Sequence, residues 1–184
     1  MKKILICSLT AAMAAMTSVS TSAANDGVAD SSSSIGDFDI TLNVPTQIIV
    51  KNFNNMLLDT SAATLGAPIV GTEDICVGGI GFASYSVNLS SQNGSSGGAG
   101  SDPFQLNGTS QNLPYTAAFI DNVANSTGTG ADVNGDITGS FARNGNLDCL
   151  SDNARVFVTV DAAVWESANE TSYSDTLTVT VTAL

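Results

Sequence analysis

Short runs in which apolar and polar residues alternate one by one constrain the fold of this chain most. The run at 173–181 is the clearest, with Leu177, Val179 and Val181 on one parity and threonines at the positions between them. A period of two predicts a β-strand with one buried face. Further candidate strands lie at 37–44, 47–50, 74–77, 84–89, 104–106, 113–120, 137–143 and 155–160.

A helical period of 3.6 residues does not persist for three turns anywhere in the sequence. The stretch 162–168 is compatible with a short helical turn or an irregular crossing, anchored by Trp165. The stretch 52–59 is expected to be a turn carrying the apolar patch 56–58. Stretches rich in Gly, Ser and Asn at 92–102 and 123–136 predict loops. Gly78 and Gly79 are expected to end the strand at 74–77, and Asn144-Gly145 to form a tight hairpin. Many short strands separated by turns predict an all-β sandwich.

The N-terminus has the three parts of a secretory signal peptide. Lys2 and Lys3 precede the apolar run 4–7, and small residues follow as far as Ala24. The apolar run is too short to span a bilayer. We therefore expect a signal peptide at 1–24, a flexible polar leader at 25–36 and a single β-sandwich domain at 37–184.

Cysteine usage fits an exported protein. Cys7 would leave with the signal peptide, so that Cys76 and Cys149 remain. Two cysteines in an oxidising compartment predict one disulfide bond. The chain contains no histidine and no CxxC motif, which argues against a zinc site.

The charge balance excludes some partners. After removal of Lys2 and Lys3 the cations are Lys51, Arg143 and Arg155, against 17 acidic residues. Nucleic acids and anionic lipids are bound by clusters of Lys and Arg, so neither is an expected partner. The acidity is interpreted as a contribution to solubility, with a basic protein partner as the alternative.

Motifs for catalysis or cofactor binding are weak. Without histidine, Ser-His and Cys-His arrangements are impossible, and no GxSxG motif occurs. The glycines at 97–100 lack the lysine of a phosphate-binding loop. Asp132–Asp136 begins like a calcium loop, but Ile137 replaces its glycine and Arg143 its bidentate glutamate. No catalytic, cofactor or metal site is expected, although a carboxylate-only enzyme stays open.

The segment 37–44 decides how the function is interpreted. Its apolar residues Phe38, Ile40, Leu42 and Val44 alternate with polar residues, and Pro45 follows directly. Proline ends regular pairing or confines a strand to a sheet edge. Such a strand near a free N-terminus can be the edge strand of its own domain, or it can be added to the open sheet of a neighbouring molecule.

The order of these features resembles the pilin subunits of archaic chaperone–usher pili, including the spore-coat-U-type domain. The resemblance lies in the signal peptide, the N-terminal alternating strand, Cys76 within 75–77, Cys149 before Asn153, and the closing strand 173–181. It covers most of the chain after residue 24. Many relatives carry a further cysteine soon after the N-terminal strand, and the region 47–50 has none.

The resemblance implies an incomplete immunoglobulin-like β-sandwich. A periplasmic chaperone would stabilise the open subunit, and at an outer-membrane usher the N-terminal strand of another copy or a related pilin would fill its groove. Phe38, Ile40, Leu42 and Val44 would then be the exchanged side chains. The expected function is a structural subunit of a surface fimbria, with no enzymatic activity, exported through the periplasm to the cell surface. The alternative is a secreted, self-contained β-sandwich that serves as an adhesive or coat module.

Overall fold

The computed structural model describes residues 24–95 and 102–184. The predicted signal peptide therefore lies outside the described residues, apart from Ala24, as does 96–101 of the predicted loop. The chain divides into two units between Asn43 and Val44, and the second unit covers 44–184. The second unit is called the body.

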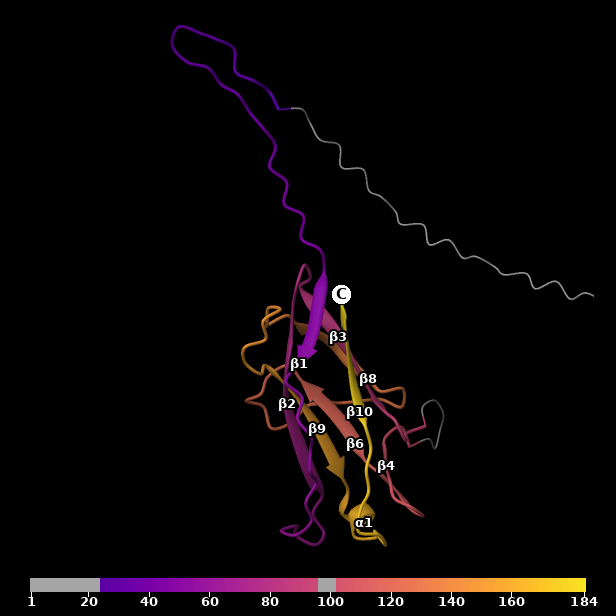
Figure 1. Cartoon of the computed structure of the whole chain (residues 1–184). Helices are drawn as coiled ribbons and strands as arrows, with labels where there is room; N and C mark the ends of the chain where they lie inside the picture. Colours follow the sequence, from indigo (N-terminus) through magenta and orange to yellow (C-terminus); the bar gives the residue numbers. More distant parts are fainter. Residues whose placement is uncertain (1–23, 96–101) are drawn as a thin grey trace, which may run out of the picture. The chain divides into compact units, whose positions relative to one another are not determined.

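The body is an all-β structure of antiparallel sheets, as predicted (Figure 1). The larger sheet has the order β1 (Gln47–Lys51), β2 (Ile69–Ile80), β9 (Ala154–Val160), β6 (Thr116–Ile120) and β7 (Thr129–Gly130). The smaller sheet has the order β10 (Leu177–Ala183), β3 (Ser84–Ser91) and β8 (Asp136–Ala142). The short strands β4 (Gln105–Asn107) and β5 (Asn112–Pro114) pair with each other, and a short helical turn forms α1 (Ala162–Trp165).

Alternating residues of both sheets form the hydrophobic core. Tyr85, Val87 and Leu89 of β3 and Phe119 of β6 are almost fully buried, as their parity predicts. The ring of Phe119 meets those of Tyr85 and Phe141 edge-on, at centroid distances of 6.4 and 4.9 Å. Such edge-to-face contacts add to the stabilisation from burial.

Two local predictions near the disulfide are wrong, both because of glycines. Gly78 and Gly79 do not end a short strand, since β2 continues through them to Ile80. A Cβ on Gly78 would lie 1.9 Å from the carbonyl oxygen of Asn146, so glycine is required for this close approach. Asn144-Gly145 does not form a hairpin either, because β8 and β9 belong to different sheets and Gly145 bridges to Gly78.

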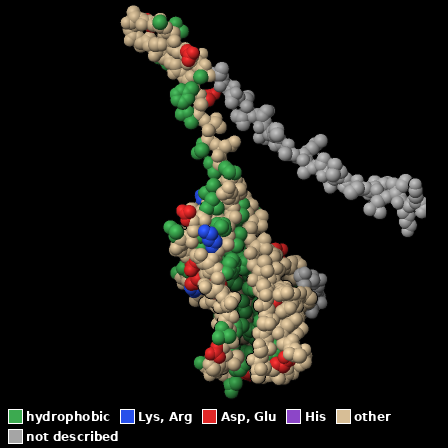
Figure 2. All heavy atoms as spheres, viewed as in Figure 1, with side chains coloured by type: hydrophobic (Ala, Val, Ile, Leu, Met, Phe, Trp, Pro, Cys, Tyr) green, Lys and Arg blue, Asp and Glu red, His purple; other side chains and the backbone are tan. Residues whose placement is uncertain are grey.

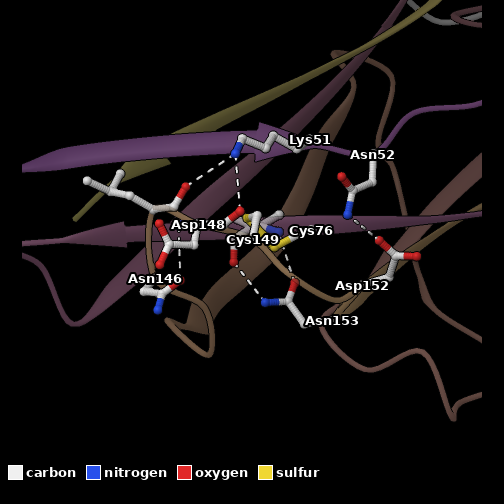
Figure 3. The surroundings of a disulfide bond; sticks show 10 residues. Lys51, Asn52, Cys76, Asn146, Asp148, Cys149, Asp152 and Asn153 are labelled. Carbon is white, nitrogen blue, oxygen red and sulfur yellow. Dashed lines mark hydrogen bonds between the residues drawn. A yellow bond between two sulfur atoms is a disulfide. The ribbon is translucent and has the colours of Figure 1, made fainter.

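The predicted disulfide is confirmed. Cys76 of β2 is bonded to Cys149, 73 residues later in the sequence, with their Cα atoms 5.6 Å apart (Figure 3). The Asn153 amide group donates to Val77 O and accepts from Val77 N, both at 2.9 Å. Lys51 Nζ donates to the carbonyl oxygens of Leu147 and Asp148. The loop before β9 is thus fastened to β1 and β2.

The acidic turn at 132–136 is held by its own backbone. Asp132 Oδ1 accepts hydrogen bonds from the backbone N–H groups of Asn134 and Asp136, at 2.8 and 2.9 Å. Gly135 supplies the positive φ of 83° that the turn requires. The carboxylate of Asp132 therefore shapes this turn.

The described part of the first unit contains a small closed loop. Asn25 and Asp37 exchange two backbone hydrogen bonds, so the predicted flexible leader has its ends joined. The strand predicted at 37–44 is not formed in the single chain, since residues 38–46 form no strand and the exposed fractions of Phe38, Ile40 and Leu42 are 73, 83 and 83%. None of the helices in the described residues is long and apolar enough to cross a membrane.

Candidate functional site: an apolar groove in the body

A groove of about 1380 Å³ lies within the body. Figure 2 shows hydrophobic side chains gathered in a stripe along the length of the body. The groove residues come from β9, from the segment after β1, from the β4–β5 pair, from the region of α1, and from β10. Its apolar lining is Phe53, Met56, Leu57, Leu58, Leu65, Ile69, Leu106, Leu113, Tyr115, Val156, Val158, Val160, Trp165, Ala168, Leu177 and Val179.

Core residues line part of this groove. Val156, Val158 and Val160 are on the core-facing parity of β9 and belong to the same hydrophobic cluster as Tyr115. Their exposed fractions are at or below 7%. The groove therefore opens onto the hydrophobic interior of the sandwich, and its lining is that of a domain core.

β10 lines one side of the groove and has an open edge. The hydrogen bonds Gln92 N to Thr176 O and Leu184 N to Ser84 O fix which of its residues pair with β3. Hydrogen bonding to a neighbouring strand alternates along an antiparallel strand. The backbone N–H and C=O groups of the even-numbered residues of β10 therefore bond to β3, whereas those of residues 177, 179, 181 and 183 point away from β3. Among the described residues no further strand pairs with β10. Such an edge is a template for strand addition.

The segment after β1 also lines the groove. Asn52 has a positive φ of 71°, at the point where β1 ends. Met56 and Leu58 then cover Gly71 of β2, since a Cβ there would lie 2.4 and 2.5 Å from Met56 Sδ and Leu58 Cδ2. Leu57 and Leu65 are exposed to 85 and 79%. Exposed leucines that line an apolar groove are typical of a binding surface.

Hydrogen bonds hold the residues around α1 in place. Trp165 Nε1 donates to Ala67 O at 2.9 Å, which confirms the predicted anchoring role of Trp165. Tyr115 Oη donates to Asp175 Oδ2 at 2.6 Å, and burial first, then this carboxylate, raises the pKa of Tyr115. The phenol therefore stays a protonated donor.

Glu170 fixes the loop between β4 and β5. Its carboxylate accepts from the backbone N–H groups of Thr109, Ser110 and Gln111 and from the Ser110 hydroxyl. These bonds favour the charged form and lower the pKa of Glu170 to about 2. Glu170 and Asp175, with Glu73 and Glu166, are the acidic residues that line the groove.

The structure confirms the predicted disulfide cysteines and does not test the predicted strand-exchange residues. It joins Cys76 and Cys149, as predicted. Phe38, Ile40 and Leu42 lie in the first unit, and Val44 is the first residue of the body, exposed to 49%. Their assignment as exchanged side chains stays a prediction, since a single chain contains no partner.

Sequence reasoning did not find the residues that line the groove. The apolar patch 56–58 was the available signal, because a turn has no local reason to carry three consecutive apolar residues. Comparisons with protein-family models, with curated proteins and with solved structures gave no match to this chain.

Proposed function

We propose that this protein is a structural subunit of a surface fimbria and polymerises by strand exchange. The segment 37–44 of one copy occupies the apolar groove of the next and pairs with the open edge of β10. The observation that carries the proposal is that core residues line the groove beside the open edge of β10, while 38–44 presents four alternating apolar residues in no strand of its own.

Such an exchange needs both apolar burial and backbone pairing to be stable. Burial of Phe38, Ile40, Leu42 and Val44 is worth roughly 1.5–3 kcal/mol each, or about 6–12 kcal/mol in total before entropic costs. Ordering the extended segment costs about 1–2 kcal/mol per residue, so backbone pairing along β10 is needed as well. The period of two in 37–44 matches this requirement, because it directs one face into the groove and the other to solvent.

The presence of the exchanged strand and the groove in the same chain would explain how copies assemble into a filament. A strand in one copy and a groove in the next form a heterologous contact, which generates an open filament when its rotation does not close. Export through the periplasm fits the Cys76–Cys149 disulfide, because such bonds persist in oxidising compartments. A subunit with an exposed core groove also needs protection before assembly, which is the role proposed for a periplasmic chaperone, with an outer-membrane usher as the site of exchange.

Complementation between two disabled variants tests the proposal. Ile40→Asn/Leu42→Asn removes the strand but leaves the groove, and Val179→Asp disables the groove but leaves the strand. Each variant alone should be monomeric in light scattering, whereas the chain of residues 25–184 should form polymers. An equimolar mixture should give only a 1:1 heterodimer, since a single contact of intact strand and intact groove is then available.

The matched control is Thr41→Asn, which changes the opposite parity of the same segment and should polymerise like the unchanged chain. Circular dichroism establishes that each variant is folded before mixing. If the unchanged chain stays monomeric and Ile40→Asn/Leu42→Asn melts at the same temperature, the chain is a self-contained module and the proposal is wrong.

A further inference from the structure

The point at which the N-terminal segment joins the body is held by a contact with β2. Thr46 Oγ1 donates a hydrogen bond of 3.0 Å to the carbonyl oxygen of Gly81, just beyond the end of β2. Gly81 has a positive φ of 77°, and a Cβ there would lie 2.9 Å from both Pro45 O and Thr46 Cα. Pro45 and Thr46 therefore pass directly over Gly81, and this arrangement is called the exit clamp.

The groove and the exit clamp lie at opposite ends of β2. Gln47 pairs with Ile80 at the clamped end, whereas the residues of β2 that line the groove are Glu73 and Ile69. At a rise of about 3.3 Å per residue, Glu73 lies about 26 Å and Ile69 about 40 Å from Gly81 along the strand. The smaller sheet gives the same placement of the groove, because the apolar β10 residues that line it, Leu177 and Val179, lie at the start of that strand.

The segment 38–44 cannot cover that distance from the clamp. Fully extended, its residues span at most about 24 Å. If it folded back at 45–46, Val44 would lie opposite Gln47 and Phe38 opposite Phe53. Ile40, Leu42 and Val44 would then run beside β1, where β10 already contacts β1, and the groove beyond Phe53 would stay empty.

Pro45 also opposes a tight reversal. The two-residue turns that join antiparallel strands require a positive φ at their first central residue. The proline ring holds φ near −65°, which excludes both turn types with Pro45 in that place. The limited length of the segment and the turn geometry at Pro45 thus both oppose entry of residues 38–44 into the groove of their own chain.

We infer that Pro45, Thr46 and Gly81 are positioning residues that prevent the chain from filling its own groove, so that strand exchange can occur only with a second copy. This inference rests on the proposed function, because it concerns the same strand and groove. It adds the reason why a subunit with both parts does not seal itself into an inert monomer.

Insertion variants of the full chain of residues 25–184 test the inference. About twelve Gly/Ser residues inserted between Val44 and Pro45 add up to ~40 Å of reach, enough for the segment to enter its own groove. At micromolar protein concentration, the tethered strand has an effective concentration in the millimolar range. It should therefore occupy its own groove in preference to the strand of another copy. This variant should be monomeric, with a melting temperature that is independent of protein concentration. The matched control places the same insertion between Gly36 and Asp37, where it lengthens the chain but leaves the reach unchanged, and should polymerise.

The outcomes separate this inference from the proposed function. If the insertion after Val44 polymerises like the control, reach is not limiting and the inference is wrong. It is also wrong if the unchanged chain is a monomer that Ile40→Asn/Leu42→Asn destabilises, because the strand then fills its own groove. If Ile40→Asn/Leu42→Asn has the same assembly mass in light scattering and the same melting temperature as the unchanged chain, the proposed function itself fails.

Discussion

At the scale of residues, side chains replace backbone partners where strands stop pairing. Asn153 bonds to both polar backbone groups of Val77, so it acts as a one-residue strand neighbour for β2. Glu170 accepts three backbone N–H groups between β4 and β5. A buried backbone group without a partner is costly, so these side chains stabilise segments that the sheets do not reach.

Glu170 should make stability depend on pH in the acidic range. Its folded pKa of about 2 lies below the ordinary value of 4.5, so its contribution is present above pH 4.5 and is lost as the pH falls towards 2. Glu170→Gln should lower the melting temperature at pH 7 and change it little near pH 2. Thermal unfolding from pH 7 to 2, in the monomeric Ile40→Asn/Leu42→Asn background, measures both effects. Equal losses at the two pH values would contradict the assigned role.

Asn153→Ala should destabilise the body by about 1–3 kcal/mol, because it leaves the N–H and C=O of Val77 without their partner. Asn144→Ala is the matched control, since Asn144 is exposed in the same loop, and it should change stability by less than about 0.5 kcal/mol. Urea unfolding in the monomeric background gives both values. A loss as small as that of the control would mean that water replaces the Asn153 amide.

At the scale of elements, β2 is central to the body. It pairs with β1 and β9, carries Cys76, and holds the exit clamp beyond one end and the groove along its other half. Its C-terminal end escaped prediction because Gly78 and Gly79 indicate a break in a sequence, whereas in the structure they allow close approach of Asn146 O and Gln47 O. Its first residues, 69–73, and the two-residue strand β7 within the predicted loop 123–136 were not predicted as strands either. Strands with one buried face, such as β3 and β6, were predicted within a few residues.

Removal of the disulfide should weaken the body without removing the groove. Cys76→Ala/Cys149→Ala opens a 73-residue loop in the unfolded chain and should cost about 4 kcal/mol in the free energy of unfolding. Urea unfolding of the monomeric background with and without reductant provides the comparison, and the reduced and substituted proteins should agree. A loss below about 1 kcal/mol would show that Lys51 and Asn153 alone hold the loop.

At the scale of the whole molecule, charge and assembly oppose each other. The sequence has 17 acidic and 5 basic residues. Asp37 and Asp39 lie within the proposed strand, and Glu73, Glu166, Glu170 and Asp175 line the groove that would receive it. Two copies must therefore approach with like charges, which favours solubility of the free subunit and slows association.

Polymerisation should accelerate with salt. Raising the ionic strength from about 0.01 to 0.15 M shortens the Debye length from ~30 to ~8 Å and screens this repulsion. Light scattering at constant subunit concentration should show a faster rise at the higher salt. Asp37→Asn/Asp39→Asn should be faster at low salt and less dependent on it. A rate that falls with salt would indicate that opposite charges guide the contact.

The sequence by itself determined the all-β class, the buried parity of most strands, the Cys76–Cys149 pair and the alternating segment 37–44. These features depend on near neighbours or on composition. A period of two needs only the residues of one strand, and once Cys7 is assigned to the predicted signal peptide the two other cysteines leave one pairing. Only the tertiary structure decided that core residues of β9 line a groove together with β10, whose outer edge has no strand neighbour among the described residues, and that the exit clamp and this groove lie at opposite ends of β2. Those facts depend on which strands become neighbours across long stretches of sequence, and no local pattern encodes which edge of a strand stays without a neighbour.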